Sequence, residues 1–439
     1  ANEHADGAFI CRYRAAVAAG GKLGSAEIQL RKRRHYTFEQ TAERDVFAER
    51  DEVLFAYRLL SYGTVGRYGI DRIVGFGYAV FIFIIIGILG ESADYQSTSA
   101  LCGKFFELSC IRFVVAEINA DGGINGYQIE FNFQDDEHDA EKSVNAYNTL
   151  KDWGMQALVG TTTSAPCIAV ADKTAADNMF QITPSGSAVE CAANPNVFRV
   201  CYSDPAQGTA SAKYIGEHKL ASKVAVIYDS SDVYSSGIYE KFAQEAPNQG
   251  LEVVDAEAFT ADSNKDFSTQ LQKAKESGAE LVFLPIYYTE ASLILQQANT
   301  MGYAPQFFGC DGMDGILQVE NFDVKLAEGL MLLTPFAADA TDDLTVNFVK
   351  SYEEAYGETP IQFAADAYDA VYIIKAAMEE ANVTPDMSAS DICDAMEGVM
   401  TQIKVDGLTG SNMSWTEDGE PEKDPKAVQV VDGAYKAME

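Results

Sequence analysis

The feature that most restricts the fold of this chain is a regular alternation of strand and helix patterns across residues 81–334. The segments KVAVIYD (223–229) and AELVFLPIY (279–287) are apolar runs of strand length, and residues 236–248 and 267–277 between them have helical periodicity. Such alternation is typical of parallel sheets with helices on both faces. Because the alternation stops after one run and starts again, we expect an α/β protein with two doubly wound, Rossmann-like lobes.

The other expected elements follow the same two periodicities. The glycines after Asp121 end the first helix, since glycine readily adopts the positive φ of a helix end. After residue 340 the chain adds two long helices and a last β segment within 411–436. The remaining expected strands are 81–89, 127–133, 155–159, 179–183, 197–201, 251–258, 306–309 and 329–334, and the remaining helices are 101–118, 140–152, 167–178, 207–219, 289–302, 341–356 and 361–381.

Residues 1–72 differ in composition from the rest of the chain. Of the chain's arginines, only Arg112 and Arg199 lie beyond residue 80. Residues 1–80 carry 12 basic and 10 acidic side chains, whereas 81–439 carry 20 basic and 56 acidic ones. Segments that differ so much in their content of charged residues rarely share one fold, so we interpret 1–72 as a basic, poorly ordered appendage.

The stretch IVGFGYAVFIFIIIGILG (73–90) has 18 uncharged residues and permits two interpretations. Its length is the lower limit for a membrane-spanning helix, and Arg67 and Arg72 precede it as a cytoplasmic flank would. Alternatively, 81–89 is a fully buried parallel strand, and 73–80 is an apolar lead-in. We favour the strand, because the first helix needs one before it.

The acidity of the chain excludes several classes of partner. Its formal charge of −34 and pI near 4.4 disfavour nucleic acid, since phosphate binding requires a basic surface. They also disfavour docking on anionic lipid, so that any membrane contact would pass through an N-terminal anchor. No helix-turn-helix pattern is evident in 1–72, which argues against a DNA-binding regulator.

No catalytic or cofactor motif is recognisable in the chain. Glycine-rich phosphate cradles are absent, and the four histidines form no convincing Ser-His-Asp or Cys-His set. The run DDEHD (135–139) resembles a metal site, but its acids precede a helix and suit the helix dipole. We therefore expect no enzyme activity, no cofactor and no metal. Cys191 and Cys201 flank a turn-rich stretch, and we consider a disulfide between them.

Polar loops at the ends of strands are the remaining rich feature. GTTTSAP (160–166) and TPSGS (183–187) offer hydroxyls and backbone amides, which suit a carboxylate. YDSSDVY (228–234), PIYYTEA (285–291) and GCDGMDG (309–315) offer tyrosines and an acid, which suit an ammonium group. Because ligands of open parallel sheets bind at the carboxyl ends of strands, this combination predicts a site for an amino acid.

Six separated segments together resemble one known family. In order they are AEINADGGINGYQIEF, DAEKSVNAYNTL, VFRVCYSDPAQG, VAVIYDSSDVYSSGIYEKF, DFSTQLQKAKESGAELVFLPIYYTEASLILQQA and FGCDGMDG. They are similar to the branched-chain amino acid (Leu/Ile/Val) binding proteins of ABC importers, over about residues 82–436. The resemblance implies a type I periplasmic-binding fold, with a hinged cleft between lobes 81–203 plus 335–420 and 204–334 plus 421–439.

The resemblance also implies roles for residues of the first lobe. Ser164 would bind the ligand carboxylate through its hydroxyl and its amide. In the loop that contains Gly186, Ser185 would use its backbone and Ser187 its hydroxyl toward the ammonium and carboxylate groups. Thr161–Thr163 are expected to be scaffold.

In the second lobe the resemblance points to two tyrosines and one acid. Tyr234 and Tyr287 would close over the ligand, and Asp311, beside Gly312, would pair with the ligand ammonium. An enclosed charge requires such a partner.

Together these observations predict a monomeric extracytoplasmic solute-binding protein that captures a branched-chain aliphatic amino acid and delivers it to an ABC permease. The alternative is the ligand-sensing domain of a membrane-anchored signalling or regulatory protein, with 73–90 as the anchor.

Overall fold

The computed structural model of this chain describes residues 27–28, 36–37 and 100–438, with side chains from Cys110 onward. The chain divides after Phe76 into two units. In the first unit, the described residues form one antiparallel pair of short strands, β1 (Glu27–Ile28) and β2 (Tyr36–Thr37). The remainder of 1–72, the lead-in 73–80 and the expected strand 81–89 lie outside the described residues.

The larger sheet of the second unit has seven strands in the order β14-β13-β10-β9-β8-β6-β7. The five strands β6 to β10 are parallel to one another, whereas β13 and β14 are antiparallel to their neighbours. The strands are β6 (Lys223–Asp229), β7 (Glu252–Phe259), β8 (Leu281–Leu284), β9 (Gln306–Gly309), β10 (Met331–Thr334), β13 (Lys426–Val431) and β14 (Ala434–Ala437).

A second, parallel sheet has three described strands, β3 (Ala157–Val159), β4 (Phe180–Thr183) and β5 (Val197–Arg199), in that order. Every residue of these strands is buried, as expected for a sheet covered on both faces. A short antiparallel pair, β11 (Ser414–Trp415) and β12 (Pro421–Glu422), stands apart from both sheets.

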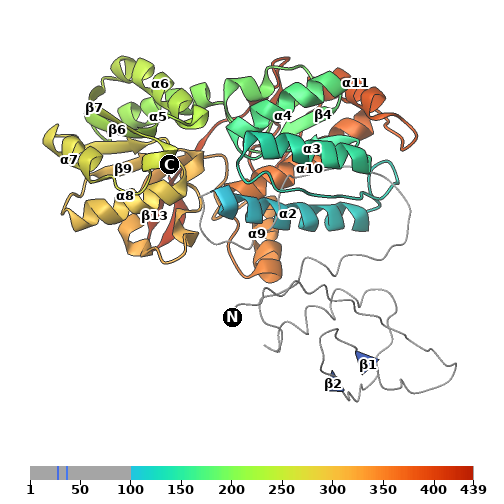
Figure 1. Cartoon of the computed structure of the whole chain (residues 1–439), viewed down its shortest axis with the longest axis horizontal. Coiled ribbons are helices and arrows are strands. Elements are labelled where there is room, and N and C mark those ends of the chain that lie inside the picture. The colour runs from blue at the N-terminus through green and yellow to red at the C-terminus, as the bar shows by residue number, and fades with distance from the viewer. Residues whose placement is uncertain (1–26, 29–35, 38–99, 439) are drawn as a thin grey trace, which may run out of the picture. The chain divides into compact units, whose positions relative to one another are not determined.

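Helices cover both sheets in two separate groups. Figure 1 shows α5–α8 around the larger sheet, and α2, α3, α4, α10 and α11 around the smaller one. We call these groups, with their sheets, the large-sheet half and the small-sheet half. The helices are α2 (Ala100–Ala120), α3 (Ala140–Trp153), α4 (Ser164–Asp177), α5 (Asp204–Glu217), α6 (Val233–Glu245), α7 (Ser268–Glu276), α8 (Tyr288–Thr300), α9 (Asp343–Tyr356), α10 (Gln362–Glu380) and α11 (Ala389–Met400).

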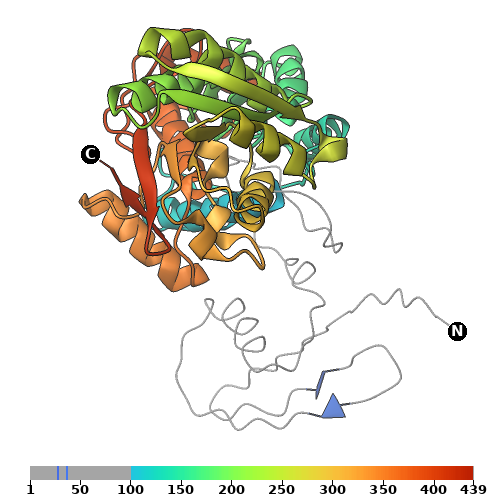
Figure 2. The same ribbon diagram turned by 90° about the vertical axis from the view of Figure 1, so that its left-hand side faces the viewer.

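The chain passes between the two halves more than once. It leaves the small-sheet half after β5, returns after β10, and leaves again after β12 to add β13 and β14 to the larger sheet. In Figure 2 these C-terminal strands, drawn in red, lie at one edge of that sheet. Several connections of this kind are what a hinge between two lobes requires. The exact lobe boundaries remain a prediction.

Helix α10 is the central helix of the small-sheet half. It is buried almost all round, including Ala364, Ala365, Ala367 and Ala370, and packs against α2. The alanines let neighbouring elements approach the helix closely, while larger side chains such as Phe363, Ile374 and Met378 fill the core around it.

The α/β fold class is confirmed, but three expected details differ. Residues 127–133 form isolated bridges at Tyr127 and Glu130 rather than a continuous strand, and the expected neighbour, 81–89, is not described. Helix α11 was not expected, although Ser388 caps it and Ile392, Met396 and Met400 line its buried face. The last β segment is four short strands rather than one. Among the helices that the structure describes, none has the length and apolar character needed to cross a membrane.

Candidate functional site

The polar loops after β3 and β4 meet as the sequence predicts. The strands are adjacent and parallel, with Val159 opposite Ile182, so their carboxyl ends bring the two loops together. Ser164 is the first residue of α4, and its Oγ accepts hydrogen bonds from the backbone N–H groups of Ser187 (3.2 Å) and Ala188 (3.1 Å). Ser164, Ser185 and Ser187 are all buried.

Gly186 occupies a position where no side chain fits. A Cβ atom there would lie 2.6 Å from Thr183 Oγ1 and 3.0 Å from Cys167 Cβ. The Gly186 N–H donates to that same Thr183 oxygen at 2.7 Å, and Thr183 Oγ1 donates to the Thr161 carbonyl at 2.7 Å. Packing therefore requires glycine here, and the Thr183 hydroxyl joins the two loops. This bonding agrees with the expected scaffold role of Thr161.

The predicted residues of the large-sheet half also lie together. Tyr234, on α6, donates its hydroxyl to Asp311 Oδ1 at 2.8 Å and accepts the Gly312 N–H at 3.0 Å. The ring of Tyr287, which precedes α8, stacks on the Tyr234 ring with centroids 4.8 Å apart. A Cβ atom on Gly312 would lie 2.5 Å from the Tyr234 oxygen, so this close contact depends on glycine.

Burial controls the charge of these groups. It raises the pKa of Asp311 to about 6, although the hydrogen bond from Tyr234 opposes the shift. The pKa values of Tyr234 and Tyr287 are raised well above 10 by the same burial, so both hydroxyls stay neutral at physiological pH. Among the described residues, the carboxyl of Asp311 is thus held by neutral donors and has no cationic partner at hydrogen-bond distance.

Asp204 is a second buried acid, which the sequence analysis missed. It is the first residue of α5, and its N–H donates to the Ser187 carbonyl at 2.9 Å. Burial, together with the charge of Asp311, raises the pKa of Asp204 well above 3.8. The nearby Ser187 hydroxyl opposes this shift, although it forms no hydrogen bond of good geometry with the carboxyl. Asp204 is therefore hydrogen-bonded to the loop of Ser187 and is close enough to Asp311 for their charges to interact. The signal available in the sequence was an acid in the first turn of α5, the helix that follows β5 where the chain leaves the small-sheet half.

His138 is another residue that the sequence analysis left unused. Its Nδ1 lies 2.7 Å from Thr163 Oγ1, and its ring meets the Tyr287 ring edge-on at 6.1 Å. Both rings line a cavity of about 90 Å³, together with Asp232 and Glu290. His138 thus links the loop of the small-sheet half to a tyrosine of the large-sheet half.

In the run 135–139, Asp139 is the helix cap, whereas Asp135 and Asp136 accept backbone N–H groups of the preceding turn. Asp139 accepts the N–H groups of Glu141 and Lys142 at 2.9 and 2.8 Å, which caps α3 as expected for acids before a helix. Within residues 100–438, no group of three His, Cys, Asp or Glu side chains is arranged to hold a metal. A larger hollow, of about 630 Å³, lies elsewhere, between Gly216, Leu220 and Gln306, and contains none of the predicted site residues.

The disulfide considered between Cys191 and Cys201 is not formed. Both are free, buried thiols. A short helix, Val189–Ala192, turns Cys191 toward Ser164 and Cys167, with its Sγ 3.6 Å from the Ser164 carbonyl, whereas Cys201 follows β5 and donates its N–H to Pro184. The spacing of the pair in the sequence did not reveal that Cys191 lies within a short helix and packs against Cys167.

The arrangement has opposite chemical character on its two sides. The small-sheet half contributes Ser164, the amides around Gly186 and the N-terminus of α4, which favour an anionic group. Across from them lie the acids Asp204 and Asp311. Two α/β halves whose polar strand-end loops meet in this way define a two-lobed ligand-binding protein.

Comparison with known proteins specifies the class. Residues 106–434 match the family described as Periplasmic binding protein, and the chain belongs to this family. It is 28% identical over 318 residues to a Leu/Ile/Val-binding protein homolog of Brucella melitensis, covering 72% of this chain and 84% of the relative. It is 26% identical to the leucine-, isoleucine-, valine-, threonine- and alanine-binding protein of Pseudomonas aeruginosa, covering 68% of this chain and 76% of that protein.

A solved structure shows the same fold. The substrate-binding protein of a branched-chain amino acid transporter from Streptococcus pneumoniae, in complex with isoleucine, has a TM-score of 0.71 and 25% identity to this chain. The match covers 81% of this chain and 99% of that one. The type I periplasmic-binding fold is thereby confirmed, and the family is one of substrate-binding proteins.

Proposed function

We propose that this chain is an extracytoplasmic receptor that binds one zwitterionic amino acid with a branched aliphatic side chain and does not convert it chemically. The observation that carries the proposal is the meeting of a hydroxyl-and-amide loop, held by Ser164, with the buried acids Asp204 and Asp311. An amino acid carries the two opposite charges that such a site complements. The names of the relatives support an aliphatic ligand.

The carboxylate of the ligand would be bound by Ser164, the backbone of Ser185 and the hydroxyl of Ser187. Gly186, whose N–H already donates to Thr183 Oγ1, would contribute by letting the loop pack closely. The dipole of α4, a helix of 14 residues, adds favourable charge at this position. Hydrogen bonds that involve a charged group each contribute about 1.5–3 kcal/mol, so a few of them give useful affinity.

The ammonium group would be bound by Asp311, with Tyr234 and Tyr287 closing over the ligand. The raised pKa of Asp204 favours its protonated, neutral form. The ligand ammonium would then face a single carboxylate charge, that of Asp311. This balance avoids burying an unpaired charge, which would cost several kcal/mol.

Ligand entry requires the two halves to separate. Tyr234 and Asp311 are each only 2% exposed, so a ligand cannot reach them in this arrangement. Rotation about the segments that pass between the halves would open the site, and differential affinity for the closed form would drive closure. We infer that an ABC permease reads the closed form of a monomeric receptor, as the family membership supports.

The test is calorimetry on the full chain with leucine, isoleucine and valine. Two analogues serve as controls: 4-methylpentanoate, which lacks the ammonium group, and isopentylamine, which lacks the carboxylate. We expect the amino acids to bind at one site per chain and the analogues at least a hundredfold more weakly. Ligand at 100 times its Kd should stabilise the protein by about 2.7 kcal/mol.

Two outcomes would contradict the proposal. One is binding of 4-methylpentanoate as tightly as leucine, which would exclude an ammonium site. The other is recovery of chemically altered leucine, by mass spectrometry, after incubation with the protein.

A further inference from the structure

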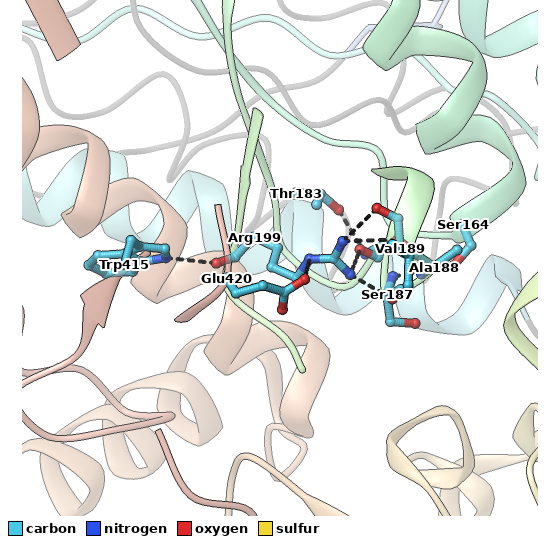
Figure 3. Close-up of polar contacts among 9 residues, drawn as sticks. Ser164, Thr183, Ser187, Ala188, Val189, Arg199, Trp415 and Glu420 are labelled. Atoms are coloured by element: carbon cyan, nitrogen blue, oxygen red, sulfur yellow. Dashed lines mark hydrogen bonds and ion pairs between the residues drawn. The ribbon is translucent and has the colours of Figure 1, made fainter. Parts of the chain in front are cut away.

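Arg199, the last residue of β5, lies at the centre of the loop that follows β4. Its side chain is fully buried, and Figure 3 shows the guanidinium directed at the backbone of this loop. Nη1 donates to the carbonyls of Gly186 (3.4 Å) and Ser187 (2.6 Å), and Nη2 donates to those of Ala188 (2.9 Å) and Val189 (3.4 Å). Four successive carbonyl groups therefore point toward one side chain.

The same residue is also bound to the segment around 415–420. Figure 3 shows two of these contacts: Arg199 Nε lies 3.3 Å from Glu420 Oε1, and Trp415 Nε1 donates to the Arg199 carbonyl at 2.9 Å. In addition, the Arg199 N–H donates to the Gly419 carbonyl at 3.1 Å. This segment leads into β13, where the chain crosses to the large-sheet half. Arg199 thus joins the loop to a connection between the halves.

The direction of a carbonyl group determines the direction of the amide in the same peptide. In a planar trans peptide, the C=O of one residue and the N–H of the next point in opposite directions. The Gly186 and Ser187 carbonyls point at Arg199, and the next N–H groups, of Ser187 and Ala188, donate to Ser164 Oγ. Arg199 therefore orients the two amides that hold the Ser164 hydroxyl.

Only arginine has the chemistry for this arrangement. Its planar guanidinium carries five N–H donors in a fixed fork, enough for four carbonyls and a carboxylate. Lysine has three donors on a compact ammonium group and cannot reach the same set. A hydrophobic side chain would leave the buried carbonyl groups without donors.

We propose that Arg199 is a positioning residue for ligand binding: it orients the Ser187 and Ala188 amides toward Ser164 and ties this loop to the 415–420 connection through Glu420. The inference rests on the proposed function, since it assigns Arg199 to the loop that would bind the ligand carboxylate. The contribution of Arg199 to affinity is then transmitted through Ser164.

The test measures leucine affinity by calorimetry for the full-length parent, Arg199→Lys and Arg199→Met. We expect at least a tenfold loss for Arg199→Lys and a larger loss for Arg199→Met. Arg112→Met is the matched control, because Arg112 is an exposed arginine that lies over the Phe133 ring. The leucine affinity of this variant should stay within twofold of the parent. If Arg199→Met does not fold, Arg199→Lys and Glu420→Gln carry the test, with a loss of at least threefold expected for the latter.

A double-mutant cycle separates positioning from a merely structural role. When Arg199→Lys is added to Ser164→Ala, we expect it to lower leucine affinity less than threefold, because both substitutions act on the same loop. When Arg199→Lys is instead added to Asp311→Asn, a substitution in the large-sheet half, it should lower leucine affinity by the same factor as it does in the parent. A folded Arg199→Lys with affinity within threefold of the parent, or a cycle with Ser164→Ala in which the losses multiply, would overturn the inference. If the parent itself binds no amino acid, the proposed function fails instead.

Discussion

At the scale of single residues, Asp311 shows how a binding site opposes stability. Its carboxyl is buried among neutral donors, and the shift of its pKa from 3.8 to about 6 corresponds to about 3 kcal/mol of unfavourable free energy when it is ionised. The charge of the buried Lys423 lowers this pKa without a contact to the carboxyl, and a ligand ammonium group would supply a countercharge in direct contact with it. The residue is therefore costly in the free protein and favourable in the complex.

We expect Asp311→Ala to weaken leucine binding at least tenfold without unfolding the protein, because the enclosed ammonium loses its partner. Asp311→Asn should retain more binding, since its amide oxygen still accepts a hydrogen bond. Calorimetry measures both variants, with the exposed Asp262→Asn as control. Affinity of Asp311→Ala within threefold of the parent would place the ammonium elsewhere.

The raised pKa of Asp311 also predicts a pH dependence. Between pH 3.8 and about 6 the folded protein binds a proton that the unfolded chain releases, so the stability of the free protein falls as pH rises through this window. Ligand binding has the opposite dependence, because the ammonium requires the ionised carboxyl. Leucine affinity should fall by up to tenfold per pH unit below about pH 6, and Asp311→Asn should lose this slope. An equal slope in the variant would assign the titration to another group.

At the scale of elements, two glycines differ in the space that surrounds them. Gly312 follows β9 against the Tyr234 hydroxyl, whereas a Cβ atom added to Gly398 in α11 would meet no atom within 4 Å. The same substitution should therefore have opposite effects at the two positions.

We expect Gly312→Ala to destabilise the protein by about 1–3 kcal/mol through overpacking and to weaken leucine binding by displacing Tyr234. Gly398→Ala should stabilise it by about 0.5–1 kcal/mol, because alanine is the better helix former. Urea unfolding measures both changes. The local geometry described for Tyr234 would be wrong if Gly312→Ala were neutral in stability and in binding.

At the scale of the whole molecule, the change of composition near residue 80 predicts independent behaviour of the N-terminal segment. We expect deletion of 1–72 to leave cooperative unfolding and leucine affinity unchanged, as measured by calorimetry and thermal melting. Deletion of 1–92 should destroy folding, because it removes the expected strand 81–89. Loss of cooperative unfolding on removal of 1–72, or a stable fold after removal of 1–92, would contradict this division.

The α/β class, the position of most strands and helices, and the loops that carry Ser164, Gly186 and Asp311 could all be predicted from the order of the amino acids. These features are accessible because burial repeats with the period of each element, and parallel strands place their carboxyl ends at one edge.

Which distant residues meet at these loops depends on the three-dimensional arrangement of the chain. Asp204 beside Ser187 and His138 against Tyr287 follow from how the chain crosses between the two halves. Arg199 lies beneath the loop because β5 pairs with β4, the strand that the loop follows. Similarly, a short helix turns Cys191 toward Cys167 rather than Cys201. Periodicity records whether a side chain is buried, but contacts between segments far apart in the sequence follow from strand order and crossings, which no local pattern specifies.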